Sequence, residues 1–340
     1  MKRIGFLFEK AFTPEALMSA YQRASRHKHG TRACFQFETH LSRNLDALHD
    51  ELHGGTYKPL PYFSFLVFEP KRRTIFAPAF RDLVVQHAIY AVVGPIFERS
   101  FIGQSFACRI GYGTHKAADY AQEALRASPR GSYTLKLDVR KFFYRIDRTI
   151  LRGLIERKIK DRRFVDLMMQ FADHGEPVGI PIGNLLSQLY ALVFLNPVDH
   201  FVKRGLKAKL YCRYVDDFIL FGLSHETLLS HKARIVTFLA EMRLELSRFT
   251  LAQVKRGVNF VGYRTWRSKR FIRKHSLYVF RRSVKRGDFE GVVSSLGHAL
   301  RTCSLAHMLR LLKEKNDALY LRLPEVFRGR HHLLPQAARG

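Results

Sequence analysis

The chain has 340 residues, of which 46% are hydrophobic and 13% aromatic, so it can bury a large core and is not a disordered tail. Its 58 Lys and Arg against 29 Asp and Glu give a net charge of +29, which favours a polyanionic partner, nucleic acid rather than a membrane surface. The four cysteines are far apart without metal-ligand spacing, which argues against a structural zinc site and a disulfide framework.

The N-terminal segment has too short an apolar stretch for a signal peptide. No run approaches the roughly 18 apolar residues of a spanning helix. We therefore expect a soluble, cytoplasmic protein with no membrane partner.

The first part of the chain predicts helices and then a hairpin. Helical spacing of apolar residues extends over Thr13–Gly55, where Thr13 and Pro14 resemble a helix start. Tyr62–Glu69 alternates like a strand, and Thr74–Ala77 is the expected return strand.

Three adjacent cations, Lys71, Arg72 and Arg73, occupy the turn of this hairpin. Such a charge run is commonly a solvated turn. Its functional interpretation is a grip on a triphosphate, because Lys and Arg are the usual partners of phosphate oxygens.

An apolar helix is predicted over Arg81–Glu98, interrupted near Gly94 and Pro95. A glycine-containing loop, Cys108–His115, follows it, and Arg109 in this loop is a candidate for a phosphate contact.

The stretch Tyr133–Ile146 predicts a strand that turns into a helix. Asp138 stands at the end of the strand, a familiar place for a metal ligand or a base, although such residues also cap the next helix. Asp147 is predicted to be a cap of that kind, for a helix running from Arg148 toward Lys160.

A loop rich in Gly and Pro, His174–Gln188, precedes helical spacing over Leu185–Phe201. Glycines before a helix let backbone amides approach a ligand, and a helix N-terminus favours phosphate. The alternative is an ordinary turn before a core helix.

Leu210–Gly222 reads LYCRYVDDFILFG, two apolar runs with Asp216 and Asp217 between them, and predicts a hairpin tipped by two carboxylates. Adjacent carboxylates repel each other, so we expect a cation, Mg²⁺ or alternatively Mn²⁺, to neutralise them. A solvated Asp-Asp turn is the alternative.

Beyond the hairpin, a helix is predicted over Ser224–Arg243 and a short strand over Asn259–Tyr263. The following segment, RSKRFIRKHSLYVFRRSVKR, interleaves cations with aromatic residues, which suits phosphate contacts and stacking. The remainder, to about Leu321, is predicted to be helical.

Each feature is ambiguous alone, but their order is informative. Asp138 ends one strand, Asp216 and Asp217 tip a later hairpin, and a glycine-rich helix start lies between them. That order can gather carboxylates around two metal ions, one activating a 3′-hydroxyl and one stabilising the leaving pyrophosphate.

At these motifs the chain resembles the reverse transcriptases. YVDD at Tyr214–Asp217 matches the family's Y-x-D-D box, LKLDVRKFF matches its first catalytic Asp motif, and NFVGY a strand near the palm-thumb boundary. The resemblance runs from about Leu66 to Tyr263. Most relatives, such as group II intron enzymes, carry Pro-Gln-Gly where this chain has Pro181, Ile182 and Gly183, so GIPIGNLLSQ looks like the branch of diversity-generating retroelements.

The resemblance implies an α+β, right-hand polymerase fold. It places an N-terminal helical extension and fingers at 1–130, a palm at 131–265 with a fingers insertion near 160–182, and a basic helical thumb at 266–340. It also implies a bacterial or phage-encoded protein.

The resemblance also implies roles for single residues. The three Asp would be catalytic and bind two Mg²⁺ ions with the carbonyl of Val139, and Phe143 would exclude a ribose 2′-hydroxyl. The incoming dNTP would meet these residues: Lys71, Arg72, Arg73, Phe143, Pro181, Ile182 and Gly183. Nucleic acid would meet these: Arg109, Tyr214, Arg270, Arg273 and Lys274.

Ile182 stands where other members place a glutamine, so we predict looser checking of the base pair and error-prone copying. The implied partners are a template or noncoding RNA, the cDNA/RNA duplex, dNTPs and a small basic accessory protein, with oligomerisation left open. Two alternatives stand beside the retroelement enzyme: an antiphage reverse transcriptase acting on a dedicated noncoding RNA, and a non-catalytic RNA-binding scaffold.

Overall fold

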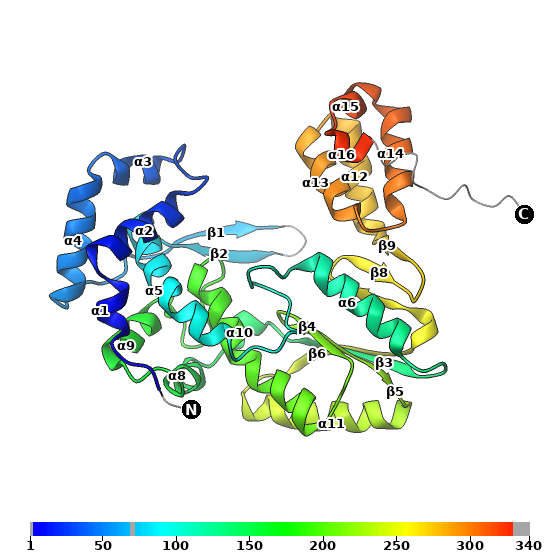
Figure 1. Ribbon diagram of the computed structural model, residues 1–340, viewed down its shortest axis with the longest axis horizontal. Helices are drawn as coiled ribbons and strands as arrows, with labels where there is room; N and C mark the ends of the chain where they lie inside the picture. Colours follow the sequence, from blue (N-terminus) through cyan, green and yellow to red (C-terminus); the bar gives the residue numbers. More distant parts are fainter. Residues whose placement is uncertain (1–2, 69–71, 329–340) are drawn as a thin grey trace, which may run out of the picture. The chain divides into compact units, whose positions relative to one another are not determined.

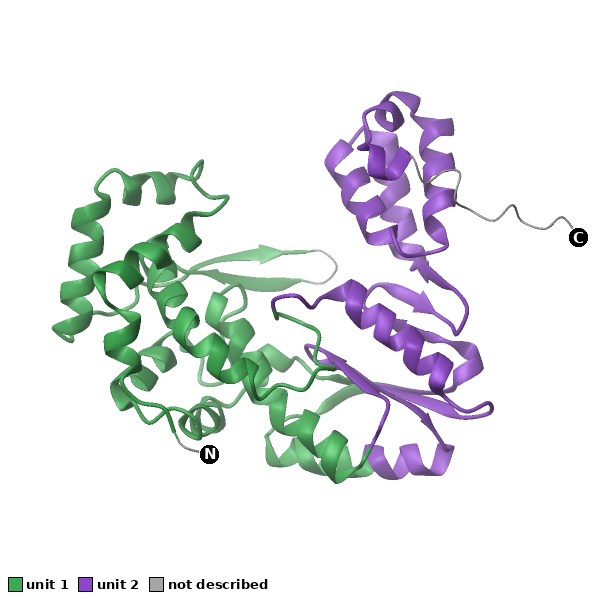
Figure 2. Ribbon diagram, viewed as in Figure 1, with its two compact units in different colours: residues 1–109, 138–207, 233–248 green, residues 110–137, 208–232, 249–340 purple. Residues whose placement is uncertain are grey.

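The computed structural model describes residues 3–68 and 72–328, and these residues form helices together with three sheets (Figure 1). The chain forms two compact units, each assembled from three separate stretches of sequence (Figure 2). Unit 1 comprises residues 1–109, 138–207 and 233–248, and unit 2 comprises residues 110–137, 208–232 and 249–340. The predicted division at residues 130 and 265 stays a prediction.

Unit 1 begins with the predicted helical segment. Thr13 caps α2, because its hydroxyl accepts the amide of Ala16, and Pro14 occupies the first helical position. Helix α2 packs along α5. The helices of this region are α1 (Leu7–Ala11), α2 (Pro14–Ser25), α3 (Arg32–Glu38), α4 (Leu41–His53) and α5 (Phe80–Glu98).

Helix α5 continues through Pro95, so the predicted interruption near Gly94 is wrong. Proline removes one backbone hydrogen bond near the end of the helix. Val93 and Phe97, on either side of it, are buried, and this packing holds the last turn in helical form.

The predicted hairpin is present as β1 (Phe63–Val67) and β2 (Arg73–Ala77). The strands pair antiparallel, in a register that sets Val67 opposite Arg73 and Phe63 opposite Ala77.

Asp147 is the predicted cap: its carboxylate accepts the amides of Thr149 and Ile150 at the start of α8. Helix α8 ends at Glu156, before the predicted end at Lys160, and a further helix that the sequence analysis did not anticipate follows. The helices here are α7 (Phe142–Arg145), α8 (Arg148–Glu156), α9 (Arg162–Gln170) and α10 (Leu185–His200).

Helix α10 is the apolar core helix of unit 1 and packs against α5 and α8. It continues into a π-helical turn, Phe201–Gly205. By length and composition alone Leu185–Gly205 could cross a membrane, so the expectation that no stretch reaches that length was too strong. Of its most apolar stretch, 67% is buried inside the protein, as in a core helix.

A four-stranded sheet follows the order β4-β5-β3-β6. It confirms the predicted acidic hairpin and the strand that ends near Asp138, while β6 was not anticipated. Helix α6 (Thr114–Ala127) packs against β4 and β5. The elements are β3 (Tyr133–Val139), β4 (Tyr211–Tyr214), β5 (Asp217–Leu223), β6 (Leu246–Gln253) and the predicted helix α11 (His225–Glu241).

The short strand predicted over Asn259–Tyr263 is instead a tight hairpin of β7 (Val258–Phe260) and β8 (Tyr263–Thr265). Phe260 pairs with Tyr263, so Val261 and Gly262 form a two-residue turn, both with positive φ. Such a turn reverses the chain within the segment. Strand β9 (Arg270–Ile272) completes the sheet.

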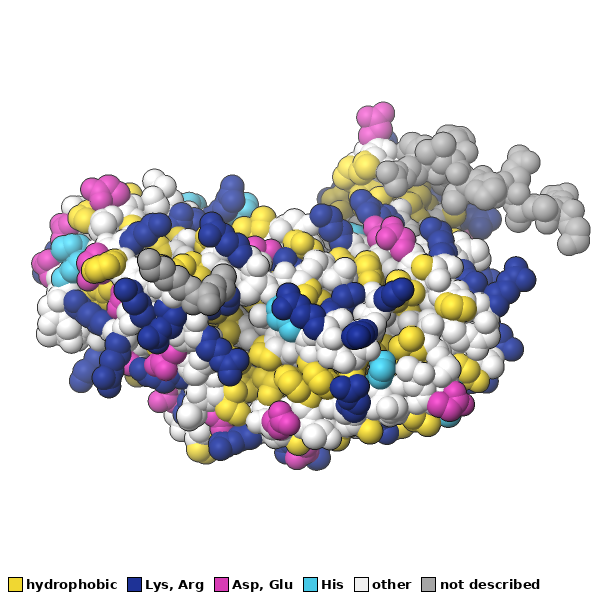
Figure 3. All heavy atoms as spheres, turned by 60° about the horizontal axis from the view of Figure 1, so that its bottom comes forward, with side chains coloured by type: hydrophobic (Ala, Val, Ile, Leu, Met, Phe, Trp, Pro, Cys, Tyr) yellow, Lys and Arg dark blue, Asp and Glu magenta, His cyan; other side chains and the backbone are white. Residues whose placement is uncertain are grey.

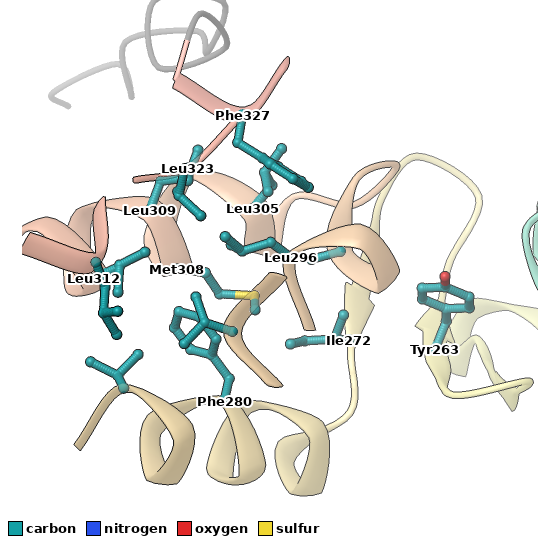
Figure 4. Packing of buried hydrophobic residues seen from close by; sticks show 14 of the residues in the cluster. Tyr263, Ile272, Phe280, Leu296, Leu305, Met308, Leu309, Leu312, Leu323 and Phe327 are labelled. Carbon is teal, nitrogen blue, oxygen red and sulfur yellow. The ribbon is translucent and has the colours of Figure 1, made fainter. Parts of the chain in front are cut away.

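The C-terminal helices confirm the helical prediction and pack around a hydrophobic core that also includes Tyr263 and Ile272 (Figure 4). Phe280, Leu296, Met308 and Leu309 are fully buried within it. The helices are α12 (Lys274–Arg286), α13 (Phe289–Ala299), α14 (Ser304–Lys315), α15 (Asp317–Leu321) and α16 (Glu325–Arg328).

Candidate active site

The acidic hairpin turns over two residues. Tyr214 pairs with Asp217, which leaves Val215 and Asp216 as the loop. Val215 has φ +55°, a region that glycine normally fills at the first position of such turns, and a β-branched residue there stores strain of about 1–3 kcal/mol. The guanidinium of the fully buried Arg213 donates to the Val215 carbonyl at 2.9 Å, which fixes the strained tip.

A lysine from the neighbouring strand meets the tip. Lys136 Nζ lies 2.7 Å from Asp217 Oδ2, with both side chains 23% exposed, and also donates to the Asn259 carbonyl at 2.9 Å. Burial, with the charge of Asp217 nearby, raises the pKa of the Cys212 thiol well above its ordinary value. The Cys212 thiol therefore stays protonated. The charge that balances Asp217 comes from Lys136.

Asp138 lies on the same strand as Lys136, two residues further on. Alternate residues of a strand share a face, so β3 presents Lys136 and Asp138 on one side. Asp138 is half-buried, and the hydroxyl of Ser247 donates to its Oδ1. Val139, the next residue, is buried.

The chemistry of these donors fits divalent ions. Asp138, Asp216 and Asp217 offer only carboxylate oxygens, the ligands that Mg²⁺ prefers, and the Val139 carbonyl is of the same hard type. The ion pair with Lys136 shows that the hairpin tip already attracts a cation. That the three carboxylates share metal ions stays a prediction.

Unit 1 gathers several of the predicted nucleotide-binding residues around the loop 179–183. The Ile180 amide donates to the Phe143 carbonyl at 2.9 Å, and the Phe76 amide donates to the Ile182 carbonyl at 2.7 Å. The loop is thereby tied to α7 on one side and to β2 on the other.

Two glycines make these close approaches possible. At Gly179 (φ +97°) a Cβ would lie 3.0 Å from the Phe143 carbonyl, and at Gly183 (φ +105°) it would lie 2.6 Å from Ile75 Cγ2. A larger residue would push the loop away from its neighbours. Pro181 is buried and Ile182 half-buried between these glycines.

Phe143 is half-buried on α7, where its ring meets the buried Phe142 edge-on at 5.5 Å. Arg72 and Arg73 are exposed at the start of β2, the strand that holds the loop. Lys71 lies outside the described residues.

Arg109 was predicted to contact phosphate, but its side chain is only 4% exposed. It lies 2.6 Å from Glu98 and donates to the carbonyls of Ile102 and Ser105. The prediction of a phosphate contact is therefore wrong. The guanidinium instead joins residues of the loop after α5 to Glu98 at the end of that helix.

Arg270 was also predicted to bind nucleic acid and is likewise buried. Its guanidinium donates to Asp119 at 2.7 Å, the Ala118 carbonyl at 2.7 Å and Gln122 at 3.1 Å. It therefore anchors β9 on α6. Arg273 and Lys274, close by in sequence, are exposed and remain predicted contacts.

Replacing Arg270 by Ala should lower the free energy of unfolding by about 2–4 kcal/mol, because it leaves buried polar partners without their hydrogen-bond donor. Urea unfolding measures the change. Arg273→Ala, which removes an exposed guanidinium three residues away, should stay within about 0.5 kcal/mol of wild type. Equal losses in the two variants would contradict the anchoring role.

Sequence reasoning missed three residues that support the hairpin and Asp138. Lys136 could have been found, because it precedes Asp138 by two positions on a predicted strand. Ser247 lies on the unanticipated β6, and Arg213 is a buried cation inside an apolar run, so neither gave a clear signal.

The fold and this arrangement define a class of protein. Residues 70–265, more than half of the chain, match the family model described as reverse transcriptase (RNA-dependent DNA polymerase). The chain belongs to the reverse transcriptase family.

The chain is similar in sequence to individual proteins. The chain is 26% identical over 291 residues to protein YkfC of Escherichia coli, covering 71% of this chain and 74% of YkfC. It is 25% identical over 212 residues to the group II intron-encoded protein LtrA of Lactococcus lactis, covering 58% of this chain and 35% of LtrA.

Solved telomerase structures share the fold. Apo telomerase from Candida tropicalis matches with a TM-score of 0.51 and 14% identity, over 80% of this chain and 58% of that one. Telomerase from Candida albicans, solved with a fragment of telomeric RNA, matches with a TM-score of 0.50 and 12% identity, over 78% and 57%. The predicted α+β, right-hand polymerase fold is confirmed. The chain spans about three-fifths of these telomerase chains and a third of LtrA.

Proposed function

We propose that this chain copies an RNA template into cDNA by two-metal nucleotidyl transfer. The observation that carries the proposal is the hairpin turn, strained at Val215, which presents Asp216 and Asp217, with Asp217 paired to Lys136 on the strand that leads to Asp138. It lies within the stretch that matches the reverse transcriptase family.

In this mechanism Asp138, Asp216 and Asp217, with the Val139 carbonyl, would hold two Mg²⁺ ions. When bound, the ions supply activation of the primer 3′-hydroxyl and neutralisation of the leaving pyrophosphate. The protein's own part is positioning. Arg213 holds the tip, Ser247 orients Asp138, and Lys136 balances the charge of Asp217.

The loop 179–183 and α7 form the proposed nucleotide site. Phe143 lines it as the steric gate against a 2′-hydroxyl, and Arg72 and Arg73 offer exposed cations for the triphosphate. The hydrogen bond from the Phe76 amide to the Ile182 carbonyl supports this site, because it joins β2 to the loop 179–183. Strand β2, which begins at Arg73, and Phe143 belong to the same unit.

The basic surface favours a nucleic-acid duplex as partner. Lys and Arg side chains are spread over the face in Figure 3, with Asp and Glu side chains scattered among them, and over the whole chain Lys and Arg outnumber Asp and Glu by 58 to 29. On α12 Lys274, Arg281 and Lys285 are exposed, whereas Phe280 and Val284 are buried. Cations presented in this way suit the backbone of an RNA/DNA duplex, which is recognised by shape.

RNA-templated primer extension with dNTPs and Mg²⁺ tests the activity. Extension that requires an RNA template and primer is the expected result. Tight RNA binding without any extension would overturn the proposal and leave the RNA-binding scaffold.

The finer proposal is error-prone copying in a diversity-generating retroelement, with a small basic accessory protein as partner. It rests on Ile182, which puts an apolar, half-buried side chain where the resemblance expects a glutamine. An antiphage enzyme with a dedicated noncoding RNA is the alternative role. Sequencing the RNA that co-purifies with the protein, and the cDNA made from it, distinguishes the two.

Ile182→Gln should lower the misincorporation rate in the cDNA about tenfold, because a polar contact to the base pair sharpens discrimination. Sequencing the cDNA measures this rate. Val178→Gln, at an exposed position just before the loop 179–183, should leave the error rate unchanged. Equal error rates in wild type and Ile182→Gln would remove Ile182 from the explanation.

A further inference from the structure

Three different metal-ligating side chains meet in the N-terminal helical region. The donor atoms of His29, Cys34 and Glu38 all lie within 4.8 Å of one another. His29 Nδ1 is 2.7 Å from Glu38 Oε1, and the Cys34 thiol donates to the same oxygen at 3.3 Å. Their spacing in sequence matches no familiar metal motif, so the cluster emerges only from the fold.

The backbone holds the three side chains in place. Cys34 and Glu38 are four residues apart on α3 and so share one face of the helix, the spacing at which helical residues chelate a metal. His29 lies in the preceding turn, which is closed by hydrogen bonds from the Lys28 amide to the Ser25 carbonyl and from the Thr31 amide to the Lys28 carbonyl, each 2.8 Å.

The distances suit a small tetrahedral ion. Bond lengths to zinc of about 2.0–2.3 Å place neighbouring nitrogen, sulfur and oxygen ligands about 3.3–3.6 Å apart. The distance from Cys34 Sγ to Glu38 Oε1 already has this value, the distance from His29 Nδ1 to Glu38 Oε1 is about half an ångström shorter, and the third pair, His29 and Cys34, lies within 4.8 Å.

Charge and access also suit such an ion. Cys34 is buried, whereas the side chain of His29 is 65% exposed and that of Glu38 is 22% exposed, so an ion reaches the cluster from solvent and a water completes the tetrahedron. The thiolate and the carboxylate together neutralise a divalent charge. The positive charge of Lys28 favours the thiolate form of Cys34.

Cys34 is a buried thiol, so an incoming ion has to displace its proton. Burial, followed by the hydrogen bond to Glu38, raises the pKa of Cys34 to about 11. A bound ion displaces the thiol proton. Tyr21 also donates to Glu38 Oε1, at 2.8 Å, and orients the carboxylate.

We propose that His29, Cys34 and Glu38 form a binding site for a divalent transition-metal ion of the Zn²⁺ type, which ties the turn after α2 to α3. This site is independent of the proposed polymerase chemistry.

Titration of chelator-treated full-length protein with Co²⁺, a spectroscopic substitute for Zn²⁺, tests the proposal. One ion should bind with a thiolate-to-metal charge-transfer absorption, and added Zn²⁺ should abolish this absorption. Absence of the absorption in the wild-type protein overturns the proposal.

Two ligand variants and two controls sharpen the test. Cys34→Ser should lose the absorption, and His29→Ala, in an exposed turn that tolerates the change, should weaken Co²⁺ binding at least about 10²-fold. Cys303→Ser, at an exposed cysteine, and Asp217→Asn should both retain the site. Persistence of the absorption in Cys34→Ser, or unchanged affinity in His29→Ala, also contradicts it.

Discussion

Primer extension by the Asp217→Asn variant should fall by about 10³-fold or more, because one charged metal ligand at the hairpin tip supplies several kcal/mol of transition-state stabilisation. The substitution keeps the size of the side chain and its place opposite Tyr214. It removes the negative charge that faces Lys136 at 2.7 Å. Single-turnover extension of a DNA primer on an RNA template measures the loss.

Asp50→Asn is the matched control. It makes the same chemical change on α4, where the carboxylate is 82% exposed, and should leave extension unchanged. RNA binding by Asp217→Asn should also remain, since the cations of α12 are untouched. Wild-type extension by Asp217→Asn would contradict the catalytic assignment.

Phe143→Ala should raise the use of ribonucleotides relative to deoxynucleotides by about 10²-fold, the scale on which an apolar pocket rejects one extra group. The ring is half-buried on α7, and its backbone carbonyl is tied to Ile180, so the loop keeps its place when the ring is removed. Competition between dNTP and rNTP on one template measures the ratio.

Tyr144→Ala provides the comparison, because this neighbouring ring is 40% exposed on the same short helix. It should retain the wild-type preference for deoxynucleotides. An unchanged preference in Phe143→Ala would show that another residue selects the sugar.

The parts of the fold that depend on local pattern could be predicted from sequence. The hairpin around Asp216 and Asp217, the strand that ends near Asp138 and the cap at Asp147 all follow from alternation, apolar runs and the preference of Asp for helix starts.

Features that depend on distant partners could not. Pro95 stays helical because neighbouring residues are buried, which only the packed fold supplies. NFVGY was missed for a local reason: its turn requires positive φ at Val261, which is unusual for a β-branched residue. Arg109 and Arg270 have the composition of phosphate ligands, yet the fold supplies Glu98 and Asp119 as their partners. A charge in sequence does not reveal which opposite charge it meets.

Cleavage of the backbone by hydroxyl radicals from Fe²⁺ bound in place of Mg²⁺ tests the central claim most directly, because it marks every segment that touches the ion. If Asp138 shares the ion with the hairpin, cuts should appear together near residues 138–139 and 214–217. Excess Mg²⁺ should suppress both sets of cuts, and so should Asp217→Asn. Cuts at the hairpin without cuts near Asp138 would contradict the shared site and, with it, the two-metal account.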